Sequence, residues 1–187
     1  MNKTDVQNYA LSKIGQEGIT ADTSDTPEAI AINYIYDATV KSVMRDHTWS
    51  CLTKRASIAA LAETPIGYSY AYQMPSDIIR LLNIEGGDDY AYEGKRILTN
   101  VGPPLQVRYV AYESNPEQWD DLLVETAATM LAAQLAEKLT GSNTKHESLM
   151  MEYKVLLNKA RYANGREKRQ YRIPRGSWVN ARLNVAD

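Results

Sequence analysis

Residues 119–141 read WDDLLVETAATMLAAQLAEKLTG, and this stretch constrains the fold class more than any other. Its apolar residues recur at helical spacing over a broad face, and Gly141 ends the run. Small side chains let a second helix approach closely. We therefore expect this side to pack inside a helical body, with contact between neighbouring copies as the alternative. The small residues are Ala127, Ala128, Ala132, Ala133 and Ala136.

Three further helices follow from the same kind of spacing. Thr26 before Pro27 favours a helix start, because threonine caps the first turn and proline suits the first helical position. Thr4 and Gln7 have the spacing of a capping box ahead of an apolar run that stops at Gly15. The predicted helices span about residues 4–14, 27–46, 119–140 and 144–163.

Between residues 56 and 112 the spacing of apolar residues changes from that of a helix to that of β-strands. Tyr68, Tyr70 and Tyr72 alternate with small residues, which is strand spacing with one face in common. A hairpin is predicted to turn at Glu93-Gly94, and the clearest strand is 105–112. The predicted fold is mainly α with a β insertion (α+β). It consists of a four-helix bundle with a small inserted β-rich region (residues 1–163) and an extended C-terminal arm (residues 164–187).

The arm follows what looks like a complete domain. Residues 161–187 read RYANGREKRQYRIPRGSWVNARLNVAD, with seven Lys or Arg against two acids. Gly165, Pro174 and Gly176 interrupt any regular element. Aliphatic residues spaced among the basic ones favour docking on a protein over binding nucleic acid, which stays the alternative. The candidate docking residues are Arg166, Lys168, Arg169, Tyr171, Arg172, Ile173, Arg175 and Trp178.

Charge is divided unevenly along the 187 residues, although the net charge is only −2. Residues 1–158 carry 13 basic and 21 acidic side chains, a net of −8. Residues 159–187 carry 8 basic and 2 acidic side chains, a net of +6. An acidic body with a basic tail favours head-to-tail contact between copies or docking on an acidic partner.

No catalytic, metal or cofactor site is predicted. The chain lacks a glycine-rich phosphate loop, and a single cysteine excludes an intrachain disulfide. His47 and Cys51 supply too few ligands for zinc, so we expect Cys51 to fill the core. The paired acids Asp88-Asp89 and Asp120-Asp121 are typical of a turn and of a helix start. The apolar runs fall short of the roughly 20 residues that a membrane helix needs, and no signal peptide is expected.

Four segments, taken in order, resemble the head-to-tail adaptors of tailed bacteriophages, in particular the tail tubular protein A family. They are VQNYALSKIGQEGI at residues 6–19, HTWSC at 47–51, YAYQMPSDIIR at 70–80 and AQLAEKLTGS at 133–142. The resemblance spans about residues 1–163. It implies a structural protein of the virion neck, assembled in the host cytoplasm, that forms a ring of usually twelve copies between the portal and the tail.

The resemblance also implies a C-terminal arm that reaches the portal and a lumen through which DNA passes. An acidic lumen would let DNA slide without sticking. The hairpin is expected to face the tail nozzle or the next tail protein, with candidate residues Gly86, Asp88, Asp89, Tyr90, Tyr92 and Gly94. Two other functional classes stay open. The first alternative is a nucleic-acid-binding protein that uses the basic arm, and the second, less favoured, is a small cell-wall hydrolase.

Overall fold

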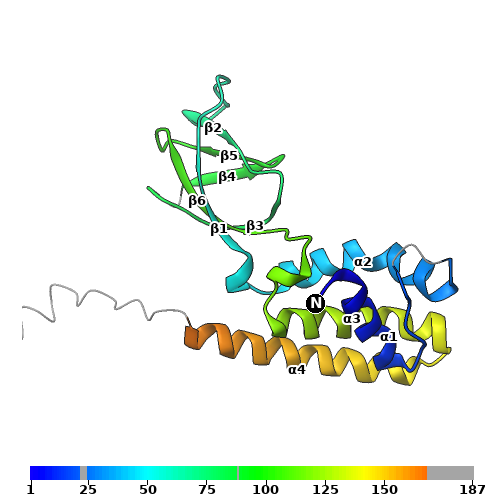
Figure 1. Cartoon of the computed structure of the whole chain (residues 1–187). Helices are drawn as coiled ribbons and strands as arrows, with labels where there is room; N and C mark the ends of the chain where they lie inside the picture. The colour runs from blue at the N-terminus through cyan, green and yellow to red at the C-terminus, as the bar shows by residue number, and fades with distance from the viewer. Residues whose placement is uncertain (22–24, 88, 168–187) are drawn as a thin grey trace, which may run out of the picture.

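The structure is a computed structural model that describes residues 1–21, 25–87 and 89–167. Within these residues the chain is a mixed α/β protein with four α-helices and two small antiparallel sheets (Figure 1). The helices are α1 (Lys3–Ile14), α2 (Pro27–Asp46), α3 (Asp121–Thr140) and α4 (Asn143–Glu167), with short 3-10 turns η1 (Ser50–Leu52) and η2 (Pro116–Gln118). The strands are β1 (Thr53–Ile58), β2 (Tyr70–Gln73), β3 (Ile78–Ile84), β4 (Tyr90–Glu93), β5 (Arg96–Thr99) and β6 (Leu105–Ala111).

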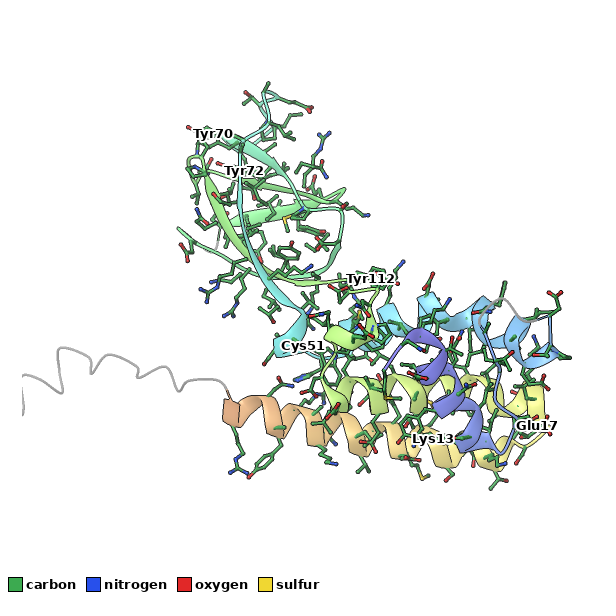
Figure 2. The ribbon with its side chains drawn as sticks, viewed as in Figure 1. Lys13, Glu17, Cys51, Tyr70, Tyr72 and Tyr112 are labelled. Atoms are coloured by element: carbon green, nitrogen blue, oxygen red, sulfur yellow. The ribbon has the colours of Figure 1, made fainter. Side chains whose placement is uncertain are left out.

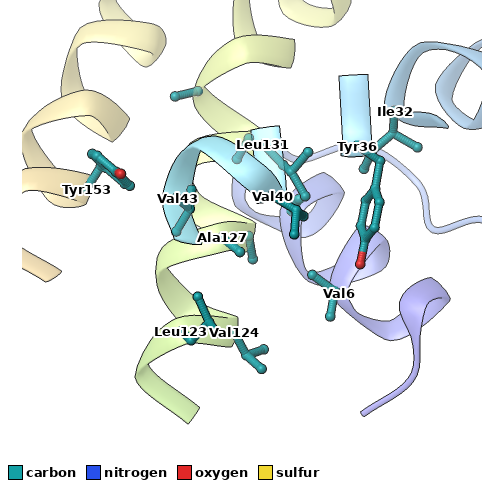
Figure 3. Packing of buried hydrophobic residues seen from close by; sticks show 14 of the residues in the cluster. Val6, Ile32, Tyr36, Val40, Val43, Leu123, Val124, Ala127, Leu131 and Tyr153 are labelled. Atoms are coloured by element: carbon teal, nitrogen blue, oxygen red, sulfur yellow. The ribbon is translucent and has the colours of Figure 1, made fainter. Parts of the chain in front are cut away.

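Helix α3 lies at the centre of the helical body and contacts α1, α2 and α4. All five alanines of its predicted slim side are fully buried within the single chain, which confirms the expectation of close helix packing. Larger side chains from the other helices fill the space around them, among them Val6, Val40 and Tyr153 (Figure 3). Because α3 is covered on several sides, its apolar residues are not confined to one stripe.

The helix starts are set by side-chain caps. Thr26 Oγ1 accepts a hydrogen bond from the Ala29 N–H at 3.3 Å, and Pro27 occupies the first turn of α2 as predicted. At α1 the predicted Thr4–Gln7 capping box is wrong. Asn2 and Asp5 form the box instead, each side chain accepting from the other's backbone N–H. The two residues of each pair are three positions apart, so spacing alone cannot tell which pair forms the capping box.

Helix α4 continues through Gly165 to Glu167, so the first four residues of the predicted extended arm are helical. The expectation that Gly165 interrupts the element is wrong. A single glycine costs a helix about 1 kcal/mol relative to alanine, which the buried residues Leu157, Ala160 and Asn164 on the preceding turns can offset.

The two sheets have strand orders β1-β6-β3 and β2-β5-β4. Their inner faces enclose a second core, separate from the helical one, that includes Tyr72, Ile97, Leu105 and Val107. The strand predicted at 105–112 is confirmed as β6, the central strand of its sheet. Regular pairing already begins at Thr53, three residues before the predicted insertion.

The predicted hairpin is present as β4 and β5, but its turn lies at Gly94-Lys95, one residue later than expected. Both residues have positive φ angles, 54° and 62°. This pattern is typical of a two-residue type I′ turn, whose twist matches that of the paired strands. Tyr70 and Tyr72 lie in β2 and join the second core, whereas Tyr68 precedes the strand.

The β region rests on one end of the helical body (Figure 1). Val110 of β6 belongs to the helical core, and Trp49 is fully buried with its Nε1–H donated to Val43 O at 3.1 Å. Two arginines join the parts through polar contacts: Arg45 donates to Ile79 O at 2.8 Å, and Arg80 donates to Thr48 Oγ1 at 2.6 Å. The β region is therefore held by packing and hydrogen bonds as well as by its connecting strands.

The substitution Ala132→Leu tests the packing around α3. Three additional carbon atoms in a filled site force neighbouring side chains out of their rotamers, and we expect a loss of about 1–3 kcal/mol in the free energy of unfolding. Chemical denaturation monitored by circular dichroism measures it. Lys138→Leu, at an exposed position of the same helix, is the control and should stay within about 0.5 kcal/mol. Equal stability of both variants would contradict close packing at α3.

Candidate docking surfaces

The described residues contain no group of three or more His, Cys, Asp or Glu that could hold a metal ion. His47 contacts the Asn164 side-chain nitrogen through Nε2 at 2.9 Å, and His146 Nδ1 lies 2.7 Å from Ala133 O. Both histidines are therefore engaged in structural contacts. In the described part of the chain, none of the helices combines the length and apolar character that crossing a bilayer requires.

Cys51 does not fill the core, and that prediction is wrong. The 3-10 turn η1 places Cys51 at the surface and its neighbour Leu52 in the interior (Figure 2). Although the residue is exposed, surrounding atoms partly desolvate the thiol and raise its pKa, and the Asp120 carboxylate adds to the rise. A raised pKa keeps the sulfur in its less reactive thiol form at neutral pH.

Most of the predicted arm lies outside the described residues. Lys168, Arg169, Tyr171, Arg172, Ile173, Arg175 and Trp178 belong to this part. Arg166 is described, and it lies exposed on the last turn of α4 with its guanidinium 5.7 Å from the centre of the Tyr162 ring. Tyr162 is exposed as well, so the helix ends on an accessible aromatic and cationic pair.

The end of α4 is fixed by Asn164, which no sequence pattern had indicated. Its Oδ1 accepts from the Ser50 backbone N–H at 3.2 Å and from Ser50 Oγ at 2.6 Å. Its Nδ2 donates to Ala160 O at 3.1 Å and contacts His47 Nε2. The side chain is buried, so these bonds tie the last turns of α4 to η1 at the base of the β region. The partners are separated by 114 residues, a distance that local spacing cannot reveal.

The six predicted hairpin residues are not gathered at one point. Gly86 and Asp89 precede β4, Gly94 follows it, and Asp88 lies outside the described residues. Tyr90 is half-buried against the second core, whereas Tyr92 is exposed. Gly86 has a structural reason to be glycine, because its φ is +104° and a Cβ would lie 2.9 Å from a methyl of Val101.

A second segment joins the hairpin turn at the end of the β region, and sequence reasoning missed it. Residues 63–67 form a loop that contacts β5 through an ion pair between Arg96 and Glu63, 3.1 Å apart. Ile66 on this loop is 99% exposed. We call this the distal tip; its open cavity of about 540 Å³ is lined by Glu63, Thr64, Pro65, Ile66, Glu93, Gly94, Arg96 and Leu98. The distal tip therefore presents one large apolar side chain to solvent beside this cavity.

Two helices carry exposed apolar stripes. On α2, Ile30 and Tyr34 lie four residues apart and are 60% and 88% exposed. On α4, Met151, Val155 and Tyr162 lie on one outward face and are 66% to 69% exposed. We call these the α2 stripe and the α4 stripe. The two stripes belong to different helices of the body, with α3 placed between α2 and α4 and in contact with both (Figure 1).

No protein-family model matches the chain, and a search of curated proteins finds none that matches it. The resemblance to phage adaptors therefore depends on the ordered segments alone and stays a prediction.

We call the hydrogen bonds between Asn164 and Ser50 the Asn164 clamp, and the substitution Asn164→Ala tests it. It leaves the Ser50 N–H without its partner in a part-buried site, and we expect a loss of about 1–3 kcal/mol in the free energy of unfolding. Faster amide hydrogen exchange at residues 50–52 should accompany the loss. Asn158→Ala, at an exposed position of α4, is the matched control. Unchanged exchange at residues 50–52 would show that the clamp does not hold this junction.

Proposed function

We propose that this chain is a structural head-to-tail adaptor of a phage virion, which assembles into a ring below the portal. The observation that carries the proposal is the pair of exposed apolar stripes on two different helices of the body, α2 and α4. A ring needs two different surfaces on each copy, one for each neighbour, whereas a symmetric dimer needs only one. The α2 stripe of one copy would pack against the α4 stripe of the next.

In this proposal the four helices form a four-helix bundle that makes up the ring wall. The basic arm, residues 164–187, docks on the portal, and the distal tip faces the next tail component. Binding is the whole mechanism, and DNA passes through the lumen without sequence-specific contact. The exposed Ile66 and Tyr92 support a partner at the tip, since apolar and aromatic side chains are common at the centres of protein interfaces.

Two single substitutions test the ring contact. Tyr34→Glu should disable the α2 stripe and Val155→Glu the α4 stripe, because each places a charge in an apolar interface. Each variant alone should stay monomeric under conditions in which the wild type assembles, as measured by sedimentation or mass photometry. An equimolar mixture should form heterodimers, since one intact stripe remains on each partner. Gln118→Glu makes the same change of charge at an exposed position away from both stripes.

A mixture that stays monomeric, or variants that assemble as well as the wild type, would contradict the α2–α4 contact.

Portal binding is tested by mixing the chain with portal rings and imaging the products. The full chain should decorate the portal, and a chain that ends at residue 167 should not. This truncation preserves α4 and the Asn164 clamp, so it separates loss of the arm from damage to the body. Equal decoration by both chains would count against arm docking. Binding of the full chain to DNA but not to portal would favour a nucleic-acid-binding protein.

A further inference from the structure

Two arginines lie side by side on the outer face of the sheet β1-β6-β3. Arg55 of β1 and Arg108 of β6 are direct partners in the antiparallel register, which places both side chains on the same face. Val107 and Tyr109, on either side of Arg108, belong to the second core. Arg108 must therefore point away from that core, because side chains alternate along a strand. Both arginines are exposed.

Neither arginine has an ion-pair partner among the described residues. Like charges directly opposite each other destabilise a sheet. The absence of an ion pair does not come from composition, since acidic side chains outnumber basic ones by 21 to 13 in residues 1–158. The pair is a local concentration of positive charge on an otherwise acidic body.

A shallow cavity of about 100 Å³ lies over the pair. This is well below the roughly 300–1,000 Å³ of pockets that hold larger ligands, so the cavity suits a single oxyanion group better than a whole nucleotide. The cavity also offers side-chain amides, and Gln106 is held in place by donating to Ser57 Oγ at 3.0 Å. One carboxylate, Glu85, opposes an anion there. The lining residues are Arg55, Asn83, Glu85, Gln106, Val107 and Arg108.

A third guanidinium continues the same face. Arg80 pairs with Val110, two residues from Arg108 along β6. One terminal nitrogen of Arg80 donates to Thr48 Oγ1. Its Nε is buried with no hydrogen-bond partner among the described residues. Arg80 does not line the cavity, but it adds a third positive charge to the same face of the sheet. At the cavity itself, two guanidinium groups face the single carboxylate of Glu85.

We propose that Arg55 and Arg108 form a binding site for a phosphate group. Guanidinium groups present paired N–H donors that match phosphate oxygens, and a tetrahedral phosphate has enough oxygens to serve two of them. Inorganic phosphate and the phosphodiester backbone of DNA share this chemistry. The binding site does not depend on the adaptor proposal, because a single copy of the chain contains all of it.

The test uses the full chain and its variant Arg55→Gln/Arg108→Gln. Inorganic phosphate, compared with chloride at equal ionic strength, should raise the thermal midpoint of the wild type by preferential binding to the folded state. The double variant should fold, since it relieves a like-charge contact, and should lose affinity about tenfold or more, because charged hydrogen bonds of this kind are worth at least that factor. Glu85→Gln should bind phosphate more tightly than the wild type.

The control Lys138→Gln/Lys154→Gln removes two exposed positive charges from the helices and should respond to phosphate as the wild type does. An equal response of the wild type and the arginine variant would overturn the proposal. An equal loss in the lysine control would also overturn it, since net charge alone would then explain the effect. A third result would overturn the proposal: the arginine variant loses self-association but responds to phosphate as the wild type does. The two arginines would then bind an acidic surface of a second copy.

A short duplex DNA identifies the source of the phosphate. If the backbone occupies the cavity, the plot of log affinity against log salt for the wild type should be steeper than for the arginine variant by roughly 0.9, the value for one phosphate contact. Inorganic phosphate should then compete with the DNA. If the two slopes agree while the midpoint shift persists, the site takes the free ion. The arm is present in every variant, so its own charge cancels from the comparison.

Discussion

Close packing around α3 is the constraint on which the remaining structure depends. Alanines at positions 127, 128, 132, 133 and 136 are fully buried, so neighbouring helices can approach the α3 backbone without a layer of large side chains between them. Large side chains of α1, α2 and α4, such as Leu11, Val40 and Tyr153, fill the interior together with the leucines of α3 itself. Because these three helices turn their large residues toward α3, their opposite faces are left to solvent. The α2 and α4 stripes are among the residues left exposed on these helices.

Much of the helical architecture could be predicted, because the spacing of apolar residues and the capping residues within a segment indicate a helix. Thr26 with Pro27 indicated the start of α2, and the strand predicted at 105–112 is β6. The errors arose where local signals are degenerate or are overridden by tertiary contacts. A 3-10 turn rotates Cys51 outward, and buried residues carry α4 past Gly165. Neither outcome can be inferred from composition.

The candidate sites were less predictable, since they depend on residues far apart in sequence. Charge and aromatic content identified the arm, and Arg166 is the one candidate docking residue of the arm that the structure describes. By contrast, the contact between Arg96 and Glu63 joins positions 33 residues apart, and Arg55 meets Arg108 only through the register of β1 with β6. A shift of that register by one residue would move Arg108 into the second core. Such sites follow from the sheet topology and could not be found from spacing along the chain.

The clamp at Asn164 gives the adaptor proposal a mechanical basis. It fixes the last turns of α4 to Ser50, where the chain enters the β region. The arm therefore begins beside the junction of the two cores, and not at the end of the body far from the β region (Figure 1). Arg80 and Arg45 join the same junction to α2 and its following loop. If the arm binds a portal, these hydrogen bonds would help to set the orientation of the distal tip relative to that portal.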